Sequence, residues 1–257
     1  MSHPTITIHY NSVLSRRRFF VKQIRGDSAE ILGEEARHLT RVLRVEPGQR
    51  FEISDNRSAW LAEIVEAHGE QVVFRILEPV VSPALPVRLT LIAAMVKFDR
   101  FEWMIEKATE LGVERILPME ATRSERGLLE RSRKRAERWR RIALESSQQS
   151  RRTTVPDILP AVRFQASLGE SAGYRYFLDE AGAPALLELL PAERKASDQT
   201  AVMIGPEGGW TNGERESATA AGWSLASLGP LILRAETAAV AALSLVSNAW
   251  MAAKSLQ

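Results

Sequence analysis

The pattern of apolar and polar positions changes near residue 87, and this change predicts two domains. Before it, four segments with partial alternation and many β-branched and aromatic residues are expected to form short strands, at residues 19–24, 49–54, 59–67 and 71–79. A short helix is expected at residues 34–44, because Pro47 and Gly48 stop it. Residues 1–80 therefore predict a small β-barrel, and the proline-bounded residues 81–86 are typical of a linker.

After residue 87, continuous apolar runs alternate with helical periods. Residues 87–95 are almost unbroken in their apolar character, which is typical of a strand covered on both faces. The other expected strands lie at residues 113–119, 174–180, 200–207 and 223–230, and the expected helices at residues 99–112, 129–149, 211–222 and 235–256. Asp99 with Glu102, and Thr211 with Glu214, have the spacing of a capping box. This alternation predicts a parallel α/β domain over residues 81–257.

The composition excludes several kinds of chemistry. Cysteine is absent, which excludes disulfides, thiolate nucleophiles and cysteine-ligated metals and fits a reducing cytoplasm. The sequence has no Walker motif, no G-x-G-x-x-G after a strand and no G-x-S-x-G elbow, and its four histidines lack metal-ligand spacing. We expect a soluble cytoplasmic protein without a metal or a membrane span, because the first residues lack a secretory pattern and residues 238–253 are too short to cross a bilayer with their polar positions.

Positive charge is concentrated in two places although the formal net charge is only +2. Residues 123–152 hold eleven Arg or Lys and four Asp or Glu side chains, and a second basic cluster lies at residues 16–25. Most of these residues are arginine, whose planar fork binds phosphate well. The clusters are consistent with a nucleic-acid surface and equally with solvated helix faces, so charge alone leaves both interpretations open.

Two expected strands end in loops with few side chains. Residues 205–209 read GPEGG, and residues 227–237 read SLGPLILRAET. Ligands of open α/β sheets bind beyond the carboxyl ends of the strands, where glycine lets a ligand approach the backbone and proline fixes the loop. Such loops suit a planar, neutral group such as an adenine edge. Each loop alone is better explained as a tight structural turn, but two of them favour a ligand site.

Five segments, in order along the chain, resemble the RsmE family, the small-subunit ribosomal RNA uridine-N3 methyltransferases of the SPOUT superfamily. They are HLTRVLRVEPGQ at 38–49, EKATELGVERILP at 106–118, ESSQQSRR at 145–152, IGPEGGW at 204–210 and LGPLILRAETAAVAAL at 228–243. The resemblance implies an N-terminal PUA-like β-barrel and a C-terminal α/β domain with a trefoil knot. It also implies S-adenosylmethionine as cofactor, a homodimer, and methylation of N3 of uridine 1498 of 16S rRNA in the small ribosomal subunit.

The resemblance also implies which residues border the cofactor. They are Leu178, Ile204, Gly205, Glu207, Gly208, Leu228, Gly229, Ile232, Leu233, Arg234 and Thr237. The chain departs from many relatives at Pro230 and Leu231, because those relatives carry an arginine nearby. The path of this loop is therefore left open.

Methyl transfer from a sulfonium needs in-line placement and control of charge rather than a covalent intermediate. Arg234 lies in the loop where it would stabilise a uridine anion, and Glu236 or Glu207 would accept the N3 proton. The other interpretation of Arg234 and Glu236 is an ion pair that fixes the loop.

RNA is expected to bind the basic clusters, mostly through phosphates. The side chains expected to contact it are Arg16, Arg17, Arg18, Arg41, Arg44, Lys97, Arg100, Arg123, Arg151 and Arg152. Residues 131–141 are also explained as a solvated helix face. Phe19 and Phe20 are more typical of core residues than of stacking residues, and the last helix fits either a core or a dimer interface.

Other functions share parts of this pattern. A methyltransferase of another RNA, such as tRNA, would carry the same motifs. A non-catalytic ribosome-assembly protein would share the basic clusters, but the intact GPEGG and ILRAET segments argue against it. A small-molecule enzyme of α/β type gives no account of the paired basic clusters.

Overall fold

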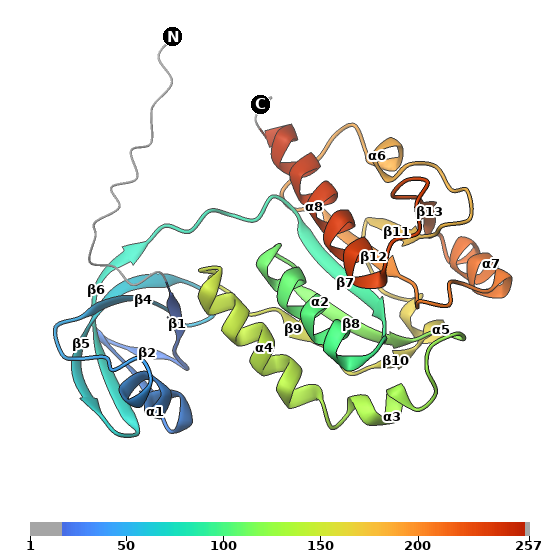
Figure 1. Ribbon diagram of the computed structural model, residues 1–257. Coiled ribbons are helices and arrows are strands. Elements are labelled where there is room, and N and C mark those ends of the chain that lie inside the picture. Colours follow the sequence, from blue (N-terminus) through green and yellow to red (C-terminus); the bar gives the residue numbers. More distant parts are fainter. Residues whose placement is uncertain (1–16, 255–257) are drawn as a thin grey trace, which may run out of the picture. The chain divides into compact units, whose positions relative to one another are not determined.

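The computed structural model describes residues 17–254, and the chain divides into two compact units (Figure 1). Unit 1 contains Met1–Ser82 and the separate segment Gln148–Thr154, and unit 2 contains Pro83–Ser147 and Val155–Gln257. The sequence pattern predicts a single division, after residue 80. We call Gln148–Thr154 the strap, because it lies within the sequence of unit 2 and yet belongs to unit 1.

Unit 1 is built on a six-stranded sheet in the order β1-β4-β5-β6-β3-β2, in which every neighbouring pair is antiparallel except β1 with β4. The strands are β1 (Arg18–Phe20), β2 (Ile24–Arg25), β3 (Ser28–Leu32), β4 (Arg50–Ser54), β5 (Ala59–His68) and β6 (Gln71–Val80). Helix α1 (Glu34–Arg41) packs on β3 and β6. Phe19, Leu39 and Phe74 belong to the core, so Phe19 packs in the protein rather than being free to stack on a base.

The local sequence signal of β3 is weak, and this strand was not predicted. Ala29 and Glu30 have little preference for strands, but burial alternates along β3, with Ala29 and Ile31 inside. All five of its residues pair with β6. Tertiary pairing therefore outweighs the local preference here. The segment expected as one strand at residues 19–24 is likewise divided between β1 and β2.

A buried ionic cluster fixes the strap to unit 1. Glu52 of β4 has a side chain only 5% exposed, and it accepts two hydrogen bonds from Arg18, at 2.8 and 3.1 Å. Arg151 of the strap also forms an ion pair with Glu52. Ser54 donates a hydrogen bond of 2.6 Å to the carbonyl of Thr153. Because a buried carboxylate needs such partners, the strap completes the environment of β4.

Unit 2 contains a seven-stranded parallel sheet in the order β10-β8-β7-β12-β11-β13, with β9 also paired to β8. The strands are β7 (Arg88–Ala94), β8 (Arg115–Glu120), β9 (Asp157–Ile158), β10 (Val162–Arg163), β11 (Tyr174–Leu178), β12 (Gln199–Ile204) and β13 (Ser224–Ala226). The helices are α2 (Phe98–Glu110), α3 (Leu128–Ser132), α4 (Ala136–Gln149), α5 (Phe164–Ser167), α6 (Leu186–Leu189), α7 (Asn212–Ala220) and α8 (Ala235–Lys254). The predicted parallel α/β arrangement is confirmed.

Helices cover both faces of this sheet (Figure 1). Leu91 and Val202 pack in one cluster with side chains of α2, α4 and α8. Ile92 and Met203, their chain neighbours, pack in another cluster with residues of α5 and α7. Neighbouring strand residues point to opposite faces, and both faces are buried, which explains the unbroken apolar run at residues 87–95.

The strand order brings three loops to one edge of the sheet. β12 lies between β7 and β11, and β13 pairs with the other side of β11, so the connection from β12 to β13 crosses β11. These parallel strands end at Leu178, Ile204 and Ala226, and the loops that follow them therefore start side by side. This is the edge of an α/β sheet at which ligands bind.

One of the two expected capping boxes is present. At the start of α7, Thr211 accepts a hydrogen bond from the N–H of Glu214 at 3.2 Å, and Glu214 accepts one from the N–H of Thr211 at 2.9 Å. The prediction for α2 is wrong, because α2 begins without a side-chain cap. Glu102 instead accepts hydrogen bonds from Arg135, which directly precedes α4, and from Arg138 of α4.

The basic helix expected at residues 129–149 is divided into α3 and α4, and many of its arginines are paired. The ion pairs are Arg131–Glu125, Arg135–Glu102, Arg138–Glu102, Arg140–Glu137 and Arg141–Glu145. This pairing favours the interpretation of the segment as a solvated helix face.

Among residues 17–254, no helix combines the length and the apolar character that crossing a membrane requires. Histidine, aspartate and glutamate side chains in the same part of the chain form no group of three that could hold a metal ion.

Candidate functional site

A pocket of about 200 Å³ opens at the edge of the sheet where β11, β12 and β13 end. We call it the strand-end pocket. Nine residues singled out by the family resemblance line it, namely Leu178, Ile204, Gly205, Glu207, Gly208, Leu228, Gly229, Ile232 and Leu233. The other lining residues were not predicted, and they are Asp179, Glu180, Pro206, Gly209, Trp210, Ser227, Leu231, Ala235 and Ala238. Most of these residues are chain neighbours of a predicted residue, so the sequence motifs mark a longer stretch of the pocket lining than the predicted residues alone.

Trp210 fixes the floor of this pocket. Its side chain is buried, its ring N–H donates to the carbonyl of Leu178 at 2.8 Å, and its ring centroid lies 4.3 Å from that of Phe177. A Cβ added to Gly205 would lie 2.8 Å from two atoms of the indole. Close packing of the end of β12 on Trp210 therefore requires glycine at position 205. The same indole joins the loops that follow β11 and β12.

Two arginines hold the backbone of the loop that follows β12. Arg123 donates hydrogen bonds to the carbonyls of Gly208, at 3.0 Å, and Trp210, at 3.3 Å. Arg215 donates to the same Trp210 carbonyl at 2.9 Å and binds both carboxylate oxygens of Asp179, at 2.7 and 2.9 Å. The hydrogen bond with Asp179 raises the pKa of the Arg215 guanidinium. The loop therefore keeps its shape through contacts within the protein.

The third wall of the strand-end pocket is apolar and exposed. Leu231 and Ile232 expose 79% and 85% of their surface, which is unusual for large apolar side chains. Gly229, two residues earlier, has a φ of 124°, in the region that favours glycine. Apolar side chains thus stand beside bare backbone, a combination typical of sites for planar ligands.

Glu207 supplies a carboxylate to this pocket and forms an ion pair with Arg100 of α2. Both side chains are partly exposed. Glu180, which was not predicted, contributes a second carboxylate to the lining. Asp179 is the third, but its charge is bound by Arg215.

Arg234, Glu236 and Thr237 do not line the pocket. Arg234 directly precedes α8 and is exposed, and within the described part of the chain its guanidinium has no hydrogen-bond or ion-pair partner. Oε2 of Glu236 is buried without a partner among the same residues. The alternative of a loop-fixing ion pair between the two is therefore not present among the described residues.

The side chains expected to contact RNA differ in exposure. Those that are exposed or half-buried are Arg17, Arg41, Arg44, Lys97, Arg100 and Arg123. Arg18 and Arg152 are buried, at 3% and 8% exposure, and Arg151 is half-buried. Burial and the contacts with Glu52 assign Arg18 and Arg151 to the ionic cluster of the strap. Arg16 lies outside the described residues.

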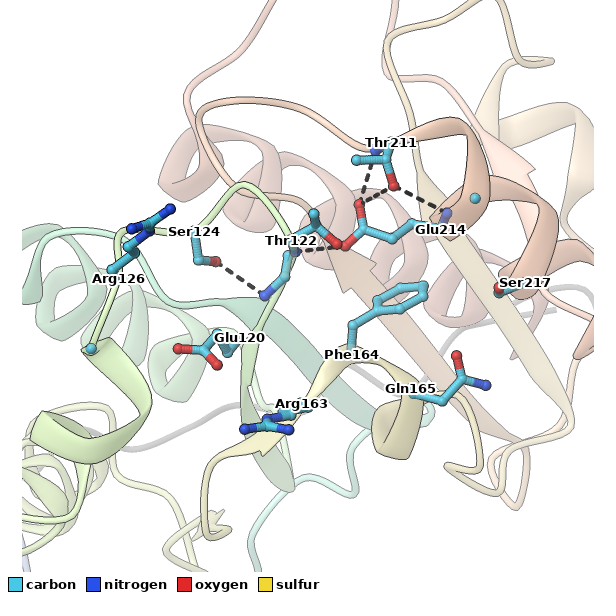
Figure 2. A pocket seen from close by; sticks show the side chains of 13 residues that line it. Glu120, Thr122, Ser124, Arg126, Arg163, Phe164, Gln165, Thr211, Glu214 and Ser217 are labelled. Atoms are coloured by element: carbon cyan, nitrogen blue, oxygen red, sulfur yellow. Dashed lines mark hydrogen bonds between the residues drawn. The ribbon is translucent and has the colours of Figure 1, made fainter.

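A second pocket, of about 600 Å³, lies beyond the ends of β8 and β10 (Figure 2). We call it the β8 pocket. It is lined by Glu120, Ala121, Thr122, Ser124, Arg126, Gly127, Arg163, Phe164, Gln165, Thr211, Gly213, Glu214 and Ser217. Glu214 joins two of its walls, because it accepts hydrogen bonds from the N–H of Thr122, at 2.8 Å, and from Thr211. The lining was not predicted.

Replacing Glu214 by glutamine is expected to lower the free energy of unfolding at neutral pH by about 1.5–3 kcal/mol, the usual contribution of hydrogen bonds to a charged group. Burial alone would raise the pKa of Glu214, but the hydrogen bonds from Thr122 and Thr211 lower it below its ordinary value. The stabilisation is therefore present above the unfolded-state pKa and is lost as the pH falls through the lower folded-state pKa. Urea unfolding of both proteins across this range should show the difference shrinking with acidity. A difference independent of pH would contradict the prediction.

Two family matches cover most of the chain. Residues 83–247 match the RNA methyltransferase domain, and residues 31–77 match the RNA methyltransferase PUA domain. Among curated relatives, the Ribosomal RNA small subunit methyltransferase E of Bacillus subtilis is 29% identical over 246 residues, which cover 90% of this chain and 96% of the relative. The protein of the same name from Synechocystis is 33% identical over 242 residues, covering 88% of this chain and 75% of the relative.

Solved structures show the same likeness. The Ribosomal RNA small subunit methyltransferase E of Neisseria gonorrhoeae, bound to S-adenosyl methionine, is 30% identical with a TM-score of 0.82, covering 91% of this chain and 98% of that chain. A Legionella pneumophila protein in complex with the bound cofactor SAM is 27% identical with a TM-score of 0.82, covering 90% of this chain and 97% of that chain. The expected SPOUT α/β domain with an N-terminal PUA domain is confirmed. The RNA methyltransferase domain covers more than half of the sequence, and the curated relatives match over most of their length. This chain therefore belongs to the ribosomal RNA small subunit methyltransferase E family of RNA methyltransferases.

Proposed function

We propose that this protein transfers a methyl group from S-adenosylmethionine to N3 of one uridine, position 1498 of 16S rRNA, in the assembled small ribosomal subunit. The strand-end pocket carries this proposal, because three loops form it at the ligand-binding edge of the sheet. The proposal is also supported by the family to which the chain belongs and by its likeness to the cofactor-bound Neisseria enzyme.

The residues of the strand-end pocket fit S-adenosylmethionine chemically. Ile232 and Leu233 with the backbone at Gly205 would hold the planar, neutral adenine. Glu180 would accept hydrogen bonds from ribose hydroxyls, and the negative charges of Glu180 and Glu207 would favour the positive sulfonium. Apolar walls with a few placed polar groups are the usual composition of cofactor sites.

Bound S-adenosylmethionine supplies the methyl group, and the protein must manage the charge of the uracil ring. We propose that Arg234 stabilises the negative charge that develops on the ring, because its guanidinium is exposed and unpaired among the described residues. Glu207 is the favoured proton acceptor, because it lines the pocket and Glu236 does not. Arg100 holds Glu207 in place through their ion pair.

Replacing Gly205 by alanine is expected to weaken the binding of S-adenosylmethionine by about 5- to 150-fold, since overpacking costs about 1–3 kcal/mol. The new Cβ would lie 2.8 Å from the indole of Trp210, and the loop would have to move. Isothermal titration calorimetry measures the loss. Gly213→Ala is the matched control, because its Cβ would meet nothing within 4 Å. Adding Trp210→Phe should restore part of the affinity, and equal affinity of Gly205→Ala and the wild type would refute the packing argument.

Binding of the small subunit is expected to weaken steeply as the salt concentration rises, because we propose that exposed Arg17, Arg41, Arg44 and Lys97 contact phosphates. For single-stranded RNA, each phosphate contact contributes about −0.7 to the slope of log affinity against log salt. Filter binding over a range of KCl concentrations measures this slope. A nearly flat dependence would contradict phosphate contacts as the main source of affinity.

We further propose that the protein acts in the cytoplasm as a homodimer. The exposure of Leu231 and Ile232 and of Met251 on α8 supports an apolar surface that another subunit would cover. The family resemblance supports the same assembly.

The experiment that tests the function is methyl transfer from labelled S-adenosylmethionine to assembled small subunits, to naked 16S rRNA and to tRNA. Nuclease digestion and mass spectrometry then locate the product. One 3-methyluridine at position 1498 in the assembled subunit is expected. Label in tRNA would show that the substrate is tRNA rather than the small subunit. Cofactor binding without labelling of any RNA would overturn the proposal.

A further inference from the structure

We propose that the β8 pocket holds a second, unpaired nucleotide of the RNA substrate, and that Arg126 and Arg163 bind its phosphates. This inference rests on the proposed function, because it assumes an RNA substrate. It assigns a role to a pocket of about 600 Å³ that the methyl-transfer chemistry leaves unused.

The position of the β8 pocket places it next to the strand-end pocket. Thr122 lines the β8 pocket, and its chain neighbour Arg123 donates to the carbonyls of Gly208 and Trp210, which line the strand-end pocket. Thr211 follows Trp210 in the chain and lines the β8 pocket again. The two pockets therefore share a wall. An RNA strand that presents one base to the strand-end pocket would bring a nearby nucleotide to the β8 pocket.

Two arginines give the β8 pocket its affinity for phosphate. Arg126 and Arg163 are exposed, and within the described residues neither guanidinium has an ion-pair or hydrogen-bond partner. This differs from the many paired arginines of α4. Figure 2 shows Glu120 between the two arginine side chains. Free guanidinium groups suit phosphate oxygens, and a carboxylate beside them suits a ribose hydroxyl or a base N–H, so the set matches a nucleotide better than a simple anion.

The rest of the lining suits a base. Phe164 forms the apolar floor of the pocket, because its ring is only 8% exposed and packs against Trp210 and Phe177, with centroids at 5.5 and 6.4 Å. Gln165 and Ser217 add polar groups beside it. The hydrogen bonds of Glu214 fix the opposite wall, as Figure 2 shows. Polar side chains above an apolar floor can bind the edges of an unpaired RNA base, and the volume of about 600 Å³ leaves room for one nucleotide.

The test uses a double variant that carries both Arg126→Ala and Arg163→Ala. It is compared with the wild type and with the control variant Arg140→Ala. Arg140 is an exposed arginine on α4 that lines neither pocket. The measurements are KM and kcat for methyl transfer to assembled small subunits, the Kd of S-adenosylmethionine, and the salt dependence of subunit binding. We expect the double variant to raise KM by about 10-fold or more. We also expect it to reduce the salt slope by about 0.7 per lost contact, with an unchanged cofactor Kd.

The outcomes separate this inference from the proposed function. A wild-type KM and salt slope in the double variant would overturn the inference. So would an equal loss in Arg140→Ala, because that would indicate general attraction by positive charge, and so would a parallel loss of cofactor binding. If the wild type methylates no RNA at all, it is the proposed function that fails.

Discussion

Arg234→Ala is expected to transfer methyl groups to the small subunit about 10²–10³-fold more slowly than the wild type, the usual effect of removing one donor that stabilises developing negative charge. The Kd of S-adenosylmethionine should stay close to the wild-type value, because Arg234 does not line the strand-end pocket. Its guanidinium has no partner among the described residues, so its removal breaks no contact within the fold. Single-turnover rates with saturating subunits, and calorimetry for the cofactor, measure the two effects.

The matched control for this substitution is Arg88→Ala. Arg88 begins β7 at the opposite end of the parallel sheet and pairs with Glu114 on the surface. Its replacement should leave the rate unchanged. Adding guanidinium ion to Arg234→Ala should restore part of the rate if the group acts on the substrate, whereas a structural role predicts no rescue. A wild-type rate in Arg234→Ala would remove this residue from the chemistry.

Glu52→Ala is expected to lower the free energy of unfolding by about 3–5 kcal/mol, the usual result of breaking a buried ion pair from one side. The substitution leaves Arg18, which is 3% exposed, with hydroxyl partners only. It also removes the ion-pair partner of Arg151 in the strap. Urea unfolding, with linear extrapolation to water, measures the change.

Glu63→Ala is the control for Glu52. Glu63 also pairs with two arginines of unit 1, Arg50 and Arg75, but those arginines are more than half exposed. Surface pairs contribute about 0–1 kcal/mol, so the control should be nearly as stable as the wild type. If both variants lost the same free energy of unfolding, the buried ion pairs of Glu52 would contribute no more to stability than the surface pairs of Glu63.

The main strands of unit 2 and its helices α2, α7 and α8 could be predicted from the sequence, whereas the short elements β9, β10, α5 and α6 were not. The strands of its sheet are buried on both faces, so their apolar runs stand out from the helical periods between them. The same signal is weak for β3, whose identity depends on pairing with β6. The capping box at Thr211 was predictable because its partners are three residues apart, whereas Glu102 is satisfied by residues that lie far along the chain.

The strand-end pocket was predictable where glycine and proline mark its loops, and less so where tertiary contacts build it. The hydrogen bonds from Arg123 and Arg215 to the loop carbonyls follow no local spacing. The β8 pocket escaped prediction entirely, because its lining comes from separate segments near residues 120–127, 163–165 and 211–217. Side chains that meet only in the folded protein leave no pattern in the sequence.

The strap has a consequence for the order in which the nascent chain can fold. Residues 83–147, which are 65 residues of unit 2, lie between the two parts of unit 1. At about 5–20 residues per second, a ribosome needs roughly 3–13 s to add them. During that interval Glu52 and Arg18 can pair, but Arg151 has not yet been made. Unit 1 therefore cannot be completed before unit 2 is begun, because its last segment is made only after about two fifths of unit 2 has been synthesised.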